Sequence, residues 1–237
     1  MKVGDLVQRV QSMYSHGVQS DDSRLSGRHI YSKLVSARAR LIEKELKSGR
    51  GFTAWSMQLL PCVNLIEAPV HECVCVPTPG CVVLRSQEPL PKLMSGRIDP
   101  YIESVTSLDG SIRYSATTWT EKQYRAHAKY TGRVPDYYLR NGYLHITWID
   151  GPRVVAVSGL FEDPWEVATF RGACGEPNPC LDPLEIDFPV EPRLVDELLE
   201  LAMQELVGRF NLTMQDERNN GRDDAAVHNG AQQLPGV

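Results

Sequence analysis

Apolar residues recur at intervals of three and four positions in three segments of the chain, the spacing that places side chains on one face of a helix. These segments cover residues 2–14, about 23–47 and 194–210. The polar run at residues 20–23 offers N-cap side chains to the second helix, and Gly49 follows its last turn, where glycine can take the left-handed conformation that ends a helix. The pattern therefore predicts one short helix and two longer ones.

Between residues 52 and 160 the pattern changes to short apolar runs separated by Pro, Gly and Asn, which is typical of strands and turns. Asn141-Gly142 supplies the two positive-φ positions of a type I′ turn, so it predicts a hairpin, and Asp109-Gly110 predicts a second turn. Asp163-Pro164 predicts the start of a short helix. The predicted strands cover residues 63–66, 73–76, 81–84, 101–105, 111–114, 137–139, 143–148 and 154–158.

The order of these elements predicts an α+β fold, in which long N-terminal and C-terminal helices pack together and flank an inserted, mainly antiparallel β region. The expected parts are the N-terminal helices at 1–51, the inserted β region at 52–162, a loop and the C-terminal helix at 163–213, and a tail at 214–237. The tail is polar and rich in Asn and Gly, which predicts flexibility.

The composition, with 42% hydrophobic and 23% charged residues, is that of a soluble globular protein. No apolar run approaches the roughly 20 residues that cross a bilayer, and the N-terminus has no secretion signal, so we expect a cytoplasmic start and no contact with a membrane.

The net charge of −5 hides a separation of charge along the chain. Residues 24–50 carry a net charge of about +6, and residues 182–224 carry about −8. The two segments are therefore expected to pair, within one subunit or between subunits. The predicted contacts between subunits join Arg38 and Arg40 of one copy to Glu197 and Glu200 of its neighbour.

Six cysteines in a chain without a secretion signal are expected to be buried, reduced thiols. The weak candidates for a metal site are His71, Cys73, Cys75 and Cys81, but their spacing does not match the usual zinc knuckles. No metal or cofactor is predicted. A small cytoplasmic metal-binding protein or enzyme that uses this Cys/His cluster is the alternative function.

No phosphate loop, nucleophile elbow, zinc helix, dinucleotide fingerprint or calcium loop is present, and no catalytic residue is predicted. Glu197 and Glu200 lie on the polar face of their helix, as solvated carboxylates do, and His145 has no evident nucleophile nearby. The protein is therefore not expected to be an enzyme. The basic helix keeps a third function open, a module that contacts DNA.

The chain resembles the ring or head-to-tail adaptor proteins in the neck of short-tailed, crAss-like phages. The resemblance covers most of the chain and rests on the opening MKVGDL, on DDSRL at 21–25 before the long helix with ARARL at 37–41, on PDYY at 135–138, on GLFEDP at 159–164 and on DFPVE at 187–191.

The resemblance implies a structural virion protein that forms a ring, commonly of twelve copies, below the portal. Such a ring joins the portal to further neck or tail proteins and continues the channel for DNA, with passing contact to the DNA. We expect the protein in the neck and tail region of the virion, and in the host cytoplasm during assembly.

Overall fold

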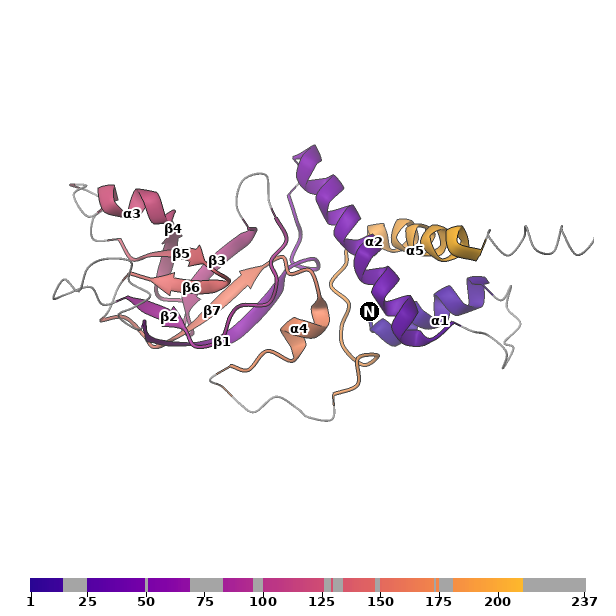
Figure 1. Ribbon diagram of the computed structural model, residues 1–237, viewed down its shortest axis with the longest axis horizontal. Coiled ribbons are helices and arrows are strands. Elements are labelled where there is room, and N and C mark those ends of the chain that lie inside the picture. Colours follow the sequence, from indigo (N-terminus) through magenta and orange to yellow (C-terminus); the bar gives the residue numbers. More distant parts are fainter. Residues whose placement is uncertain are drawn as a thin grey trace, which may run out of the picture.

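The protein has two parts, a β-barrel and a small helical body (Figure 1). The computed structural model describes residues 1–14, 25–49, 51–68, 83–95, 100–125, 129, 134–147, 150–172, 174 and 181–210. Figure 1 shows the barrel at one end of an elongated molecule and helices α1, α2 and α5 at the other, with α3 at the outer end of the barrel.

Seven strands form the barrel, which closes because β1 pairs with β7 as well as with β2. The order around it is β1-β2-β6-β5-β4-β3-β7, and the described pairs are antiparallel except β4 with β5. The strands are β1 (Gln58–Glu67), β2 (Leu84–Ser86), β3 (Ile102–Ser107), β4 (Arg113–Ala116), β5 (Asp136–Arg140), β6 (Tyr143–Ile146) and β7 (Val154–Gly159).

The interior of the barrel is filled by aliphatic and aromatic side chains, with Val63, Leu144, Val157 and Phe161 fully buried among them. Alternation along β7 places Val155 and Val157 inside, because successive side chains of a strand point to opposite faces. The barrel is therefore a packed core and not a channel.

The predicted fold class is wrong. The sequence suggested long terminal helices that flank an antiparallel insert, whereas the dominant element is a closed barrel that contains a parallel pair. The pairing of β1 with β7 joins residues about 90 positions apart, such as Val63 and Val155. Next to this pair, the N–H of Leu65 donates to the carbonyl of Arg153 at 2.7 Å. Periodicity along the chain carries no information on such a pairing, since it describes each strand separately.

The helical body contains α1 (Val3–Tyr14), α2 (Gly27–Ser48) and α5 (Val195–Phe210), preceded by a 3-10 turn, Pro192–Leu194. Helix α2 begins later than expected, with Ser26 as its N-cap, and ends as predicted at Gly49, whose φ is 73°. The core of the body is formed by apolar faces of all three helices, including Leu6, Leu34 and Leu198.

The two predicted turns and the short helix after Asp163 are confirmed. Asn141 and Gly142 have φ values of 53° and 80°, and Gly110 has 71°. Helix α4 (Pro164–Ala168) has Asp163 as its N-cap. Tyr31 of α2 donates a 2.6 Å hydrogen bond to the Asp163 carboxylate, and burial together with this bond raises the pKa of Tyr31.

Arg38 of α2 joins the helical body to the barrel. Its side chain is 1% exposed, and its guanidinium donates to the carbonyls of Phe161 and Pro189, both at 2.7 Å, and of Ser56 at 3.4 Å. Burial lowers the pKa of Arg38 to about 10. Because these carbonyls belong to three separate segments, one planar side chain holds the helix, the end of the barrel and the segment before α5 together.

Apolar contacts surround this junction. Ile42 of α2 packs with Met94 and Leu160, which lie beside the barrel, and Phe52 and Tyr101 meet edge to face at 5.5 Å. None of the helices among the described residues is long and apolar enough to cross a membrane.

A buried carboxylate, Glu191, also lies at this junction. Its side chain accepts a 3.1 Å hydrogen bond from the backbone N–H of Thr53 and contacts Arg193, which in turn bonds Glu45 at 3.1 Å. The bond from Thr53 and the nearby Arg193 guanidinium hold the pKa of Glu191 below its ordinary value.

We expect Glu191 to contribute to acid sensitivity. A carboxylate with a lowered pKa stabilises the fold fully above its unfolded pKa, and this contribution is lost as the pH falls through the folded pKa. Between about pH 5 and about pH 3, the free energy of unfolding should therefore fall more steeply in the wild type than in Glu191→Gln. Urea titrations at stepped pH measure both slopes, and parallel slopes would contradict the prediction.

A disulfide joins Cys62 on β1 to Cys174, with the two Cα atoms 5.6 Å apart. Our expectation that the cysteines are reduced is wrong for this pair, because two residues 112 positions apart are adjacent once the barrel forms. Gly172 lies so close to Cys62 that an added Cβ would meet its carbonyl oxygen at 2.5 Å. The segment after α4 is therefore held tightly against β1.

Reduction of this disulfide should lower stability by about 2–4 kcal/mol, because cross-linking a long loop removes conformational entropy from the unfolded chain. The measurement is the urea midpoint with and without a thiol reductant. Cys62→Ser should show the lower midpoint in both conditions, and a reductant effect that persists in this variant would contradict the assignment to this bond.

Candidate docking site

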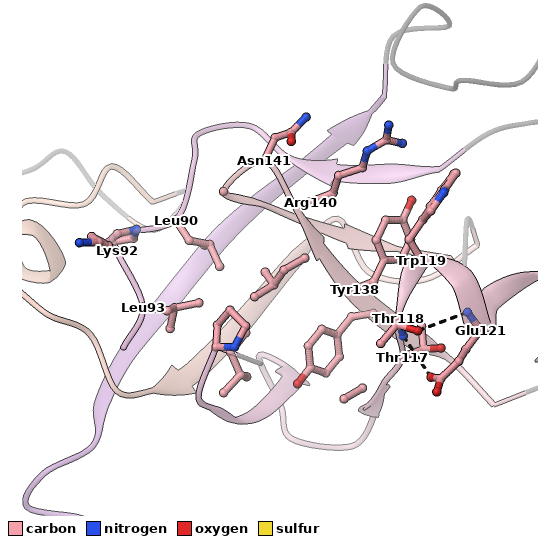
Figure 2. A pocket seen from close by; sticks show the side chains of 17 residues that line it. Leu90, Lys92, Leu93, Thr117, Thr118, Trp119, Glu121, Tyr138, Arg140 and Asn141 are labelled. Atoms are coloured by element: carbon pink, nitrogen blue, oxygen red, sulfur yellow. Dashed lines mark hydrogen bonds between the residues drawn. The ribbon is translucent and has the colours of Figure 1, made fainter. Parts of the chain in front are cut away.

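A pocket of about 600 Å³ opens beside the barrel, between the segment before β3 and the hairpin β5–β6. Figure 2 shows Leu90 and Leu93 on one side of it and Tyr138, Trp119 and Arg140 on the other. Its volume lies in the range of small-ligand and peptide sites, and its walls are largely apolar.

Aromatic side chains form one wall of this pocket. Trp119 lies 5.4 Å from the ring of Tyr138, which stacks on His145 at 4.8 Å, and the Arg140 guanidinium lies 4.8 Å over the Trp119 ring. The expectation that His145 is a structural histidine agrees with this stack. Such a stack fixes the wall in place, since each ring limits the rotation of the next.

Trp119 is positioned by α3 (Trp119–Arg125), a helix that our sequence reading did not predict. Thr118 and Glu121 cap it reciprocally, since each backbone N–H donates to the side chain of the other residue at 3.3 Å. This is the Thr-x-x-Glu capping box, a signal that was present in the sequence. Figure 2 shows this pair at the edge of the pocket.

The four predicted interface residues lie on α2 and α5. Arg38 is inside the subunit, as described above, and Arg40 pairs with Glu205 of its own chain at 3.0 Å. Glu197 pairs with Lys44 at 2.6 Å, and Glu200 is exposed. The structure therefore does not bring the four side chains together as one cluster, and their contact with a neighbouring copy stays a prediction.

Ion pairs between α2 and α5 account for part of the charge separation seen in the sequence. Lys33 and Arg40 both reach Glu205, whose side chain is only 12% exposed, and Lys44 reaches Glu197. These cations are thus partly neutralised by the chain's own carboxylates, which weakens the alternative that α2 is a DNA-contacting surface.

The weak metal candidates, His71, Cys73, Cys75 and Cys81, lie outside the described residues. Within the part of the chain that the structure describes, no group of three or more His, Cys, Asp or Glu side chains could hold a metal ion.

A filled barrel, a helical body joined to it by one buried arginine, and a pocket with a rigid aromatic wall are features suited to binding and assembly. Thr118, Glu121 and Arg140 of the pocket are engaged in capping and stacking. The Thr117 hydroxyl has no partner among the described residues.

Comparison with known proteins gives the family. The model of the family described as phage tail ring protein 2 matches residues 5–225, and the chain belongs to this family. It is 29% identical over 220 residues to "Ring protein 2" of Bacteroides phage crAss001, which covers 87% of this chain and 91% of that protein. The predicted resemblance to ring proteins of crAss-like phages is confirmed, and the family is one of structural tail components.

Proposed function

We propose that copies of this protein close into a ring in the phage neck, which joins the portal to the tail and continues the channel for DNA. The observation that carries this proposal is that both parts of the elongated molecule expose large apolar side chains (Figure 1). Trp119 and Tyr124, 39% and 73% exposed, lie at the barrel end, and Met13 and Val207, 44% and 39% exposed, lie on the helical body.

Exposed apolar side chains on both the barrel and the helical body are compatible with heterologous contacts, in which one surface of a copy meets a different surface of the next. Such contacts close into a ring when the rotation allows. They also leave surfaces for components above and below. Membership of the ring-protein family supports the role of a ring component. The contact with the portal, the copy number of twelve and the enclosed DNA are further parts of the proposal.

Charged groups on the helical body would also take part in the contacts between copies. Arg40, Glu197 and Glu200 are the surface residues that a neighbouring copy would contact, while Arg38 keeps the barrel and the helices in a fixed relation. A fixed relation matters because a small change of angle between the two parts would alter the rotation between successive copies.

The test is the mass of purified full-length protein by light scattering, with electron microscopy, alone and mixed with the portal protein of the same phage. Rings, formed alone or on the portal, are the expected result. A monomer at every concentration that also ignores the portal would overturn the proposal. DNA retention should be weak, and strong retention that falls steeply with salt would favour the DNA-contacting alternative.

A further inference from the structure

Strand β5 extends further along the pocket than its parallel partner β4. Strand β4 ends at Ala116 after two parallel pairs with β5, the second of which joins Ala116 to Tyr137, whereas β5 continues to Arg140. Beyond Tyr137, the described part of the chain pairs β5 with β6 alone. The last three residues of β5, 138–140, therefore have no strand partner on this side among the described residues.

Backbone groups of β5 are directed toward this side. Arg140 and Tyr143 flank the two-residue turn and face each other across the hairpin, so the alternation of an antiparallel pair turns the N–H and C=O of Leu139 away from β6. The same alternation explains why the carbonyl of Tyr137, on that side, accepts from the N–H of Thr117 at 2.9 Å.

A second polar group supports the same conclusion. The hydroxyl of Thr117 lines the pocket, is buried, and has no hydrogen-bond partner within the described part of the chain. A buried hydroxyl without a partner costs free energy, which an incoming backbone would remove by bonding to it. Together with the edge at Leu139, it suits an extended peptide better than a compact ligand.

We propose that this pocket receives residues 211–217 of a neighbouring copy as an added strand. Leu212 and Met214 of that segment are two positions apart, so an extended backbone directs both side chains to one face, toward Leu90 and Leu93 of the pocket, and Thr213 to the other. The inference rests on the proposed function, since it specifies one contact of the ring.

Charge favours the same occupant. Asp216 and Glu217 follow the apolar pair in the sequence. Arg140 lines the pocket with its guanidinium over the Trp119 ring. Lys92, on the opposite side (Figure 2), already pairs with Glu162 at 2.8 Å. A strand seated by Leu212 with its acidic end toward Arg140 would gain a charge contact that the reverse direction lacks.

The segment must come from another copy because its own pocket is out of reach. Helix α5 ends at Phe210 and points away from the barrel, while the pocket lies beside α3 at the opposite end of the molecule (Figure 1). Seven extended residues span at most about 25 Å. Running back beside the 16 residues of α5 would use about 24 Å, before the chain reached the barrel.

The contact is heterologous, since the helical end of one copy engages the barrel end of the next, and repeating it generates a closed ring or a filament. Val207, exposed in the last turns of α5, and Trp119 beside the pocket would then be covered by the same interface.

The first test compares Leu212→Asp with Thr213→Asp in the full chain, under the conditions in which the wild type forms rings. The two variants add the same charge to the same segment, but only Leu212 faces the pocket. We expect at least tenfold weaker self-association for Leu212→Asp and a change within about twofold for Thr213→Asp, with unchanged thermal unfolding of the dissociated protein.

The second test places a photoreactive amino acid at Lys92 and identifies the cross-linked peptide by mass spectrometry. Cross-links to residues 211–217 of another copy support the inference. Rings that form equally well in both aspartate variants, or cross-links to a different segment or protein, overturn it and leave the ring itself standing. Failure of the wild type to form rings would instead count against the proposed function.

Discussion

Replacing Arg38 by alanine should destabilise the folded protein by about 3–5 kcal/mol, measured as the free energy of unfolding in urea. The substitution removes a guanidinium that is 1% exposed and leaves the carbonyls of Phe161 and Pro189 buried without their charged donor. It also leaves a cavity at the junction of the barrel and the helical body.

Two comparisons make the result specific. Arg38→Lys keeps the charge but lacks the planar fork that reaches three segments, so it should recover only part of the loss. Arg40→Ala, two positions along the same helix, removes a side chain that is 61% exposed and should cost less than about 1 kcal/mol. Equal losses in the free energy of unfolding for Arg38→Ala and Arg40→Ala would show that the buried hydrogen bonds of Arg38 do not account for its effect on stability.

Loss of Arg38 should also affect assembly beyond its effect on stability. If the guanidinium sets the angle between the two parts, Arg38→Lys should form fewer closed rings than the wild type at a temperature where both are folded. Electron microscopy of both proteins would reveal this as open or irregular oligomers.

Phe161→Ala should be comparably destabilising, by about 3–5 kcal/mol, because a fully buried ring is removed from the barrel core. Phe161 follows β7, packs inside the barrel and is bridged to Leu93 in the wall of the pocket. The cavity would therefore lie directly behind the proposed docking site.

The matched control is Leu59→Ala on β1, where the side chain is 57% exposed and the change should stay within about 0.5 kcal/mol. Urea unfolding followed by circular dichroism gives both values. A Phe161→Ala protein as stable as the control would mean that the barrel interior can collapse around the missing ring.

Several elements were determined by short-range signals in the sequence. The spacing of Leu34 and Leu41 identified the buried face of α2, and Gly49 identified its end. Asn141-Gly142 identified the β5–β6 hairpin, since few other residues tolerate both positive-φ positions. The capping box at Thr118 was an equally local signal that our reading overlooked.

The pocket beside β5 could not be predicted in this way. It depends on where β4 stops relative to β5, and this register is set by pairing between Ser115 and Asp136 and not by any local pattern. The predicted interface residues illustrate the same difficulty, because a helical wheel places Arg38 on α2 without revealing that the barrel covers it.

The sequence by itself determined the helices, the turns, the succession of short strands and the likeness to phage ring proteins, because each depends on neighbouring residues or on patterns kept along the chain. The tertiary structure alone decided that the strands close into a barrel, that Arg38 is buried at its junction, that Cys62 meets Cys174 and that a pocket opens beside β5. Each of these joins residues far apart in the chain, and such contacts are selected by packing and strand register, which local periodicity does not encode.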